Sequence, residues 1–135
     1  MKICLAGTGA MGLTHMKALR KIDGVEVASV NSRTAERGKA FAAEWKIPFT
    51  STSLEECIDR PNIDAVILAT PSGLHADQAV LALSRGKHVQ VEIPMSLDLA
   101  SAEKVNDAQR KSGKVCMITH THVASPRHTA RFADA

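Results

Sequence analysis

Three glycines near the start of the chain have the spacing of a phosphate-binding turn. Gly7, Gly9 and Gly12 follow the short apolar run 3–6 and precede a stretch with helical spacing of apolar residues. In such a turn the first glycine lets the chain bend sharply, the second lets the backbone approach a pyrophosphate, and the third lets helix and strand pack closely. The N–H groups at the start of the helix then face the phosphates. Because the turn lies between a predicted strand and a predicted helix, it indicates a dinucleotide site. We expect this site to include Gly7, Thr8, Gly9, Ala10, Met11 and Gly12.

The residues about 20 positions after this turn decide which dinucleotide fits. An acidic residue there would accept a hydrogen bond from the ribose 2′-OH of NAD and repel a 2′-phosphate. This chain instead has Asn31, Ser32, Arg33 and Thr34. Hydroxyl groups can donate to a phosphate, and Arg33 can make a charge-assisted contact with it. The sequence therefore favours NADP, with NAD as the alternative if Arg33 is a solvated surface residue and the hydroxyls only cap a helix.

Apolar runs alternate with amphipathic stretches along the whole chain. Strands are predicted at residues 3–6, 25–30, 47–49, 64–69, 88–92 and 115–119. Helices are predicted at residues 13–22, 34–45, from 53, from 76 to about 85, and from 98 to about 111. The run 64–69 is nearly continuous in apolar residues, which is typical of a strand buried on both faces of a parallel sheet. The pattern predicts a single α/β domain with a doubly wound parallel sheet of six strands, a Rossmann fold.

The composition limits the other classes of function. The 135 residues carry a net charge of +3, which suits an anionic cofactor but is also ordinary for a soluble protein. Aromatic residues make up 3% with no Tyr, and like charges form no block, so we expect no nucleic-acid partner. The N-terminus has the pattern of neither a signal peptide nor a membrane span. The three cysteines form no C-x-x-C pair, so we expect a reduced, cytoplasmic protein with no metal site.

Two later motifs carry a resemblance to a known family. Residues 69–75 (Ala-Thr-Pro-Ser-Gly-Leu-His) and 86–94 (Gly-Lys-His-Val-Gln-Val-Glu-Ile-Pro), taken with the glycine turn, resemble the N-terminal domain of the Gfo/Idh/MocA oxidoreductases. The resemblance covers essentially the whole chain and implies an NAD(P)-dependent dehydrogenase. It also implies that Thr70, Pro71 and His75 line the path from the adenosine to the nicotinamide. Glu92 and Pro94 would border the nicotinamide itself.

The chain departs from most of this family at Ile93, where a lysine usually lies near the reacting carbon. Isoleucine can neither transfer a proton nor orient a substrate hydroxyl group. A branch that oxidises semialdehydes resembles this chain and manages without the lysine. The resemblance therefore implies oxidation of the hemiacetal of a carboxylated hydroxymuconic semialdehyde to a lactone in aromatic ring-cleavage catabolism. The alternatives are a sugar or polyol dehydrogenase of the same family and a non-catalytic, truncated nucleotide-binding module.

Histidines are the candidate bases for such a reaction. His120 and His122 follow the sixth predicted strand, and imidazole titrates near neutral pH. The alternative is that they cap this strand or contact the cofactor ribose. His15, on the first predicted helix, is expected either near the pyrophosphate or packed in the core.

The family also has a C-terminal domain that forms most of the substrate site. We therefore expect residues 1–120 to form the NAD(P)-binding domain and residues 121–135 to begin the connection to a substrate domain absent from this chain. By itself the chain is then expected to be inactive. For a full-length form, the resemblance implies a small-molecule substrate and a homo-oligomer.

Overall fold

Six parallel strands form one sheet in the order β3-β2-β1-β4-β5-β6. The computed structural model describes residues 1–120. The strands are β1 (Lys2–Ala6), β2 (Glu26–Asn31), β3 (Thr50–Ser51), β4 (Ala65–Leu68), β5 (His88–Glu92) and β6 (Cys116–Thr119). The order runs outward in one direction from β1 to β3 and in the other from β4 to β6, so a crevice opens between β1 and β4 at the carboxyl ends of the strands. The predicted six-stranded, doubly wound parallel sheet is confirmed.

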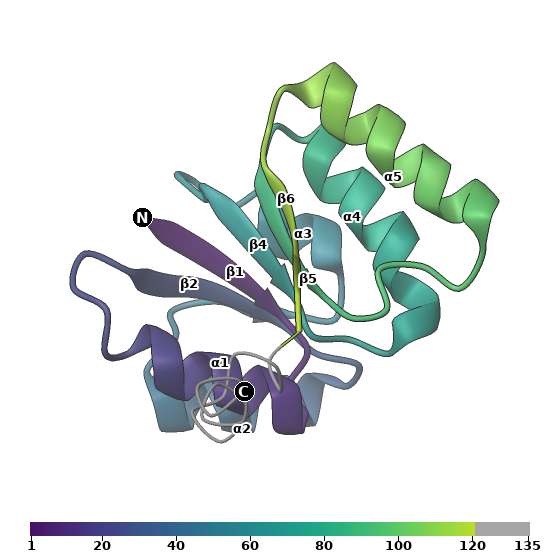
Figure 1. Cartoon of the computed structure of the whole chain (residues 1–135). Coiled ribbons are helices and arrows are strands. Elements are labelled where there is room, and N and C mark those ends of the chain that lie inside the picture. The colour runs from purple at the N-terminus through teal and green to yellow at the C-terminus, as the bar shows by residue number, and fades with distance from the viewer. Residues whose placement is uncertain (121–135) are drawn as a thin grey trace, which may run out of the picture.

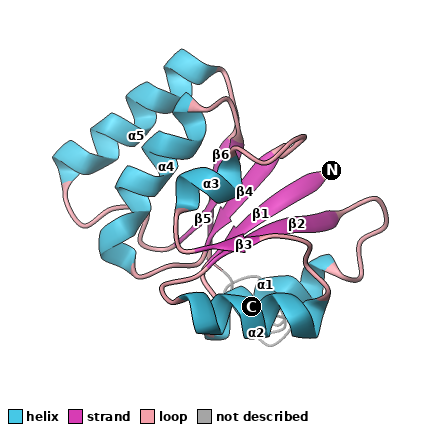
Figure 2. Ribbon diagram, turned by 180° about the vertical axis from the view of Figure 1, so that it is seen from behind, coloured by secondary structure: helices cyan, strands magenta, loops and turns pink. Residues whose placement is uncertain are grey.

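Helices cover both faces of this sheet (Figures 1 and 2). They are α1 (Ala10–Leu19), α2 (Ala35–Trp45), α3 (Leu54–Ile58), α4 (His75–Ser84) and α5 (Leu99–Ser112), with a 3₁₀ turn, η1 (Ser72–Leu74), before α4. Helices α1 and α2 lie on one face, and α3, α4 and α5 lie on the other. The sheet therefore buries apolar side chains on both sides, which explains its uninterrupted apolar runs.

Strand β1 shows how the two layers of the core are built. Cys4 and Ala6 belong to the buried cluster beneath α3, α4 and α5, whereas Ile3 and Leu5 belong to the cluster beneath α1 and α2. All four side chains are at most 4% exposed. Since successive side chains of a strand point to opposite faces, this one strand anchors both layers and fixes where the glycine turn leaves the sheet.

Capping side chains fix where three helices begin. Thr34 accepts a hydrogen bond from the backbone N–H of Arg37 at the start of α2, and Ser53 accepts one from Glu56 at the start of α3. Asp98 accepts the N–H of Ser101 at the start of α5. Polar side chains at these positions replace hydrogen bonds that the first turn of a helix cannot make within itself.

The third strand lies later in the chain than the sequence pattern predicts. Strand β3 is Thr50–Ser51, and Thr50 pairs with Val30 of β2. The side chain of Ile47 instead packs in the cluster beneath α1 and α2, directly after α2 ends. Pro48 has no N–H to donate to a neighbouring strand, so the ladder forms only beyond it. The prediction of a strand at 47–49 was wrong because Ile47 is a core residue that precedes the strand.

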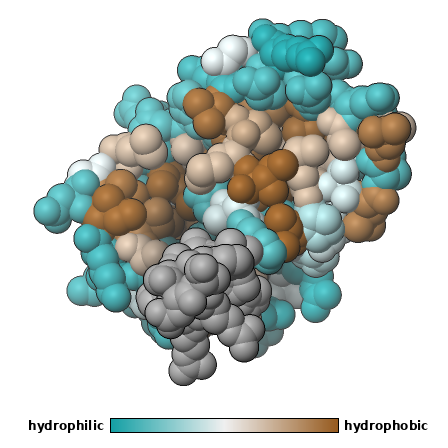
Figure 3. Space-filling model, in the orientation of Figure 1, coloured by the Kyte–Doolittle hydropathy of each residue, from teal (hydrophilic) through white to brown (hydrophobic). Residues whose placement is uncertain are grey.

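Apolar side chains also remain at the outer edge of the sheet. Met117 and Ile118 of β6 are 50% and 51% exposed. Figure 3 shows brown, apolar atoms over β6 on the side of the molecule that faces the viewer.

In the described part of the chain, no helix has the length and apolar character needed to cross a membrane.

Candidate cofactor site

The three glycines of the turn meet different constraints. Gly7 has φ +106°, and a Cβ there would lie 2.4 Å from the carbonyl oxygen of Ala69. A Cβ on Gly12 would lie 2.0 Å from the carbonyl oxygen of Gly7. These two glycines therefore allow close backbone packing. A Cβ on Gly9, by contrast, would meet no described atom within 4 Å, so this position opens toward the space where a ligand would approach.

Helix α1 begins directly after the turn with its N-terminus open. No side chain caps its first turn, and that turn contains no acidic residue. Free N–H groups and the positive end of the helix dipole favour an anion at this position. The residues of the turn therefore fit a pyrophosphate, both in the space that they leave and in the charge that they favour.

A hollow of about 350 Å³ lies beside the turn, between β1 and the end of β2. Its lining comprises Thr8, Gly9, Ala10, Met11, Ser32, Arg33, Arg37, Ala69, Thr70 and Pro71. The hydroxyl oxygens of Thr8 and Ser32 lie 3.0 Å apart, and Ser32 is only 2% exposed. Arg33 and Arg37 are exposed. Two guanidinium groups and two hydroxyl groups thus gather where the adenosine ribose lies in Rossmann folds.

A second hollow of about 330 Å³ continues from the first across the ends of β4 and β5. The two share Met11, Ala69, Thr70 and Pro71 in their linings. The remaining lining residues of the second hollow are Ser72, His75, Glu92, Ile93 and His120. Residues from the glycine turn and from the ends of β2, β4, β5 and β6 therefore border one continuous space.

His75 connects the loops that follow β4 and β5. It is 1% exposed, and its Nδ1 lies 2.8 Å from the carbonyl oxygen of Pro94. Its Nε2 lies 2.7 Å from the carbonyl oxygen of Thr70. Because a carbonyl oxygen only accepts, the ring nitrogen that carries the hydrogen donates to the carbonyl group that it faces. Pro94 does not line either hollow itself, but His75 holds its backbone at the edge of the second one.

His15 forms a buried contact with Glu92. The His15 Nε2 and the Glu92 Oε1 lie 2.7 Å apart, and the two residues are 9% and 7% exposed. The sequence left open whether His15 lies near the pyrophosphate or packs in the core. The structure turns its ring toward the end of β5. Of the two candidate bases, His120 is exposed and lines the second hollow, whereas His122 lies outside the described residues.

Comparison with known proteins identifies a family with the same fold. Residues 1–120 match the oxidoreductase family with an NAD-binding Rossmann fold. The chain belongs to the Gfo/Idh/MocA oxidoreductase family. One relative in this family is the 4-carboxy-2-hydroxymuconate-6-semialdehyde dehydrogenase of Sphingobium sp. (strain NBRC 103272 / SYK-6). It is 45% identical over 128 residues, which are 95% of this chain and 41% of that protein. Another is the 1,5-anhydro-D-fructose reductase of Ensifer adhaerens, 40% identical over 72% of this chain and 29% of that protein.

Solved structures of similar proteins have the same fold. The biliverdin reductase of Synechocystis sp. PCC 6803, in complex with biliverdin and NADP+, has a TM-score of 0.88 and 26% identity, over 98% of this chain and 42% of that one. A 3-ketoreductase from Actinomadura kijaniata, in complex with TDP-benzene and NADP, has a TM-score of 0.87 and 27% identity, over 99% of this chain and 42% of that one. The chain thus spans about two fifths of the length of the Sphingobium relative and of both these proteins.

Sequence reasoning missed one residue and one contact of this site. Arg37 lies in the first turn of α2 and lines the first hollow together with Arg33, which precedes the N-cap Thr34. This second arginine close after Arg33 was visible in the sequence. The contact between His15 and Glu92 joins positions 77 residues apart and had no local signal.

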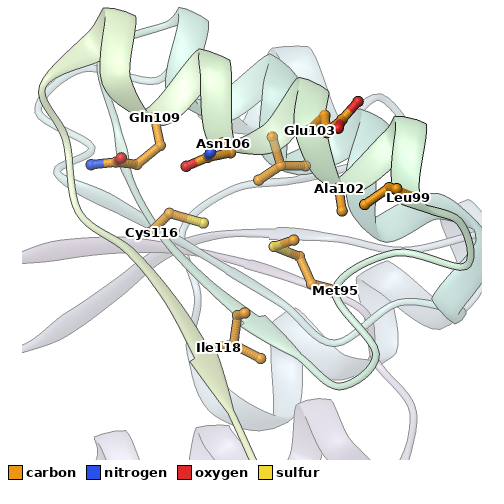
Figure 4. Close-up of a pocket in the computed structure, with 9 residues that line it drawn as sticks. Met95, Leu99, Ala102, Glu103, Asn106, Gln109, Cys116 and Ile118 are labelled. Atoms are coloured by element: carbon orange, nitrogen blue, oxygen red, sulfur yellow. The ribbon is translucent and has the colours of Figure 1, made fainter.

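A third hollow of about 410 Å³ lies apart from the predicted site, between α5 and β6 (Figure 4). Met95, Leu99 and Ile118 give it a largely apolar lining, with Gln109 and Cys116 toward its other end. None of the predicted site residues lines this groove.

The cysteines lie outside both parts of the cofactor site. Cys4 and Cys57 are fully buried, and Cys116 is partly buried. The contact with Cys57, together with burial, raises the pKa of the Cys4 thiol, and the same contact lowers the pKa of Cys57. Burial raises the pKa of Cys116. Among the described residues, no group of three or more His, Cys, Asp and Glu side chains could hold a metal ion.

Proposed function

We propose that this chain is the cofactor-binding part of an NADP-dependent dehydrogenase. The observation that carries the proposal is the lining at the end of β2, where Ser32, Arg33 and Arg37 border the first hollow. Glu36, the acidic residue in the first turn of α2, is not part of that lining. A 2′-phosphate there would receive hydrogen bonds from guanidinium and hydroxyl groups and would meet no carboxylate of the lining.

Each part of the continuous space would hold a different part of the cofactor. The open N-terminus of α1 and the backbone at Gly9 would receive the pyrophosphate. The second hollow, with Glu92 and Ile93 at the end of β5, would border the nicotinamide. Met11 lines both hollows and would lie beside the cofactor where it passes from one to the other.

For the substrate, we propose the hemiacetal form of a carboxylated hydroxymuconic semialdehyde. A bound NADP would supply the hydride acceptor. The hemiacetal carbon would then lose its hydrogen as hydride and the hydroxyl group its proton to a base, which leaves a lactone. The identity to the Sphingobium dehydrogenase supports this substrate. Ile93 supports the same substrate, because it replaces the lysine of most relatives and the proposed reaction does not use that lysine. His120 is the proposed base, since its imidazole is exposed beside the second hollow. His122 is the second candidate from the sequence.

Substitution of Arg33 tests the cofactor preference. Loss of a charge-assisted contact with the 2′-phosphate should weaken NADPH binding by roughly 10- to 150-fold, while NADH binding changes little. Arg37→Ala should act in the same direction. Lys39→Ala removes the same charge from α2 at an exposed residue that does not line the hollow, and serves as the control. Titrations monitored by nicotinamide fluorescence give both affinities. Equal losses for NADPH and NADH in the Arg33 variant would contradict the proposal.

A turnover screen tests the substrate. A longer protein that continues this chain through a substrate domain should oxidise the ring-cleavage semialdehyde with NADP. Faster turnover of inositol or hexoses would favour a sugar or polyol dehydrogenase instead. Cofactor binding without turnover of any of these compounds in the longer protein would favour a non-catalytic nucleotide-binding module.

A further inference from the structure

The contact between His15 and Glu92 links the two halves of the cofactor site. His15 belongs to α1, the helix that begins at the glycine turn, and Glu92 is the last residue of β5. Their side chains meet at 2.7 Å with little exposure to solvent. The turn would receive the pyrophosphate, and the end of β5 would border the nicotinamide. One side-chain contact therefore joins the elements that bind these two groups.

The surroundings of this contact place it at the base of the second hollow. Glu92 lines that hollow, and so does Met11, which lies four residues before His15 on α1. Residues four apart lie on the same side of a helix, so Met11 and His15 face the same region. The imidazole Nε2 lies 2.7 Å from the buried Glu92 Oε1, so this contact restricts the orientations open to the Glu92 side chain.

We propose that His15 is a positioning residue for the nicotinamide end of the cofactor. It acts by holding the Glu92 carboxylate at the border of the second hollow. This inference rests on the proposed binding of a dinucleotide across the two hollows. The adenosine end would contact Ser32 and Arg33 on the other side of the turn, and neither residue touches His15 through a described hydrogen bond. Loss of His15 should therefore weaken binding of the nicotinamide half and leave binding of the adenosine half intact.

The test compares two ligands and two polar variants of the present chain. NADPH contains both halves of the cofactor, whereas 2′,5′-ADP contains only the adenosine half with its two phosphates. The amide nitrogen of a glutamine reaches the position of the imidazole Nε2, and that of an asparagine reaches only the position of Nδ1. His15→Gln should therefore retain the contact with Glu92, and His15→Asn should lose it.

For His15→Asn we expect NADPH affinity to fall by about tenfold, the size expected for a lost hydrogen bond to a charged group. The affinity for 2′,5′-ADP should stay within about twofold of wild type. His15→Gln should recover most of the NADPH affinity. Thr14→Ala is the control, because Thr14 is the exposed neighbour on the same helix and lines neither hollow. Thermal melting of each variant shows that it is folded at the temperature of the titration.

The outcomes separate this inference from the proposed function. If wild type binds both ligands and His15→Asn loses affinity for both equally, His15 only supports the fold, and the positioning role is overturned. Unchanged NADPH affinity in His15→Asn, or no recovery in His15→Gln, would overturn it as well. If wild type binds neither ligand, the proposed function itself fails, and this inference fails with it. Should His15→Asn not fold, His15→Ser also removes the contact and must show the same split between the two ligands.

Discussion

The hydroxyl oxygens of Thr8 and Ser32 lie 3.0 Å apart, and this contact joins the glycine turn to the end of β2. Thr8 belongs to the segment that would bind the pyrophosphate, and Ser32 to the segment that would select the cofactor. Ser32 is almost fully buried, so its hydroxyl group has a fixed position at the bottom of the first hollow. In the proposed site, this pairing would set the distance between the pyrophosphate and the ribose.

A carboxylate at position 32 should reverse the cofactor preference. Ser32→Asp would repel a 2′-phosphate and could accept a hydrogen bond from a ribose 2′-OH. The ratio of NADPH affinity to NADH affinity should therefore fall by about tenfold or more, as measured by fluorescence titration. Ala43→Asp adds the same charge to an exposed part of α2 outside the hollow and should leave the ratio near that of wild type. An unchanged ratio in the Ser32 variant would mean that the ribose lies elsewhere.

Alanine substitutions at two glycines of the turn should separate folding from binding. Gly12→Ala places a Cβ against the Gly7 carbonyl group, so it should lower the free energy of unfolding by about 1–3 kcal/mol. Gly9 has φ −81° and ψ −166°, which alanine adopts readily, and its Cβ would meet no described atom. Gly9→Ala should therefore melt close to wild type and yet bind NADPH at least about tenfold more weakly. Circular dichroism and titration measure the two effects. Wild-type affinity in Gly9→Ala would argue against a pyrophosphate at this turn.

The glycine turn and the sheet could be predicted because their signals are local. Strand, turn and helix follow one another within 19 residues, and the apolar runs mark strands that are buried on both faces. The residues at the strand ends could then be assigned to one edge, since parallel strands all end on the same side. Residues as far apart in sequence as Met11 and His120 do border one hollow.

The errors and omissions arose where tertiary contacts outweigh local pattern. Ile47 has the character of a strand residue, but it packs in the core while the ladder forms at Thr50. The contact between His15 and Glu92 depends on how α1 lies against the end of β5, and no spacing in the sequence encodes it. His75 was predicted from the motif at 69–75, but that motif does not show that both ring nitrogens face backbone carbonyl groups.

Acid should weaken the structure partly through the cap of α5. The backbone N–H and the hydroxyl group of Ser101 donate to Asp98 and lower the pKa of its carboxyl group below 3.8. Because the folded-state pKa is the lower one, this cap stabilises the fold above about pH 4 and is lost as the pH falls through the folded-state value. Asp98→Asn keeps a capping oxygen without the charge.

The melting temperature of the Asp98→Asn variant should therefore fall less between about pH 5 and about pH 3 than that of wild type. The other carboxyl groups titrate in both proteins, so the difference between the two curves reports on Asp98. Parallel curves would contradict a charged cap. Asp107→Asn, on the exposed side of the same helix, should follow the wild-type curve.

Thiol labelling should distinguish Cys116 from the two cysteines of the core. Cys4 and Cys57 have no solvent exposure, so a thiol reagent should modify them only after unfolding. Cys116 is partly exposed, but burial raises the pKa of its thiol, so it should react slowly at neutral pH and faster as the pH rises. Counting modified thiols with a chromogenic disulfide reagent should give at most one in the native chain and three in denaturant. Rapid modification of all three in the native chain would contradict the buried positions of Cys4 and Cys57.

In the proposed function, this chain binds NADP across the glycine turn and the end of β2. The most direct measurement is the affinity of the wild-type chain for NADPH and for NADH, titrated under identical salt and pH. The site predicts that NADPH binds at least about tenfold more tightly than NADH, the difference expected for one charge-assisted contact with the 2′-phosphate. Equal affinities, or tighter binding of NADH, would contradict it.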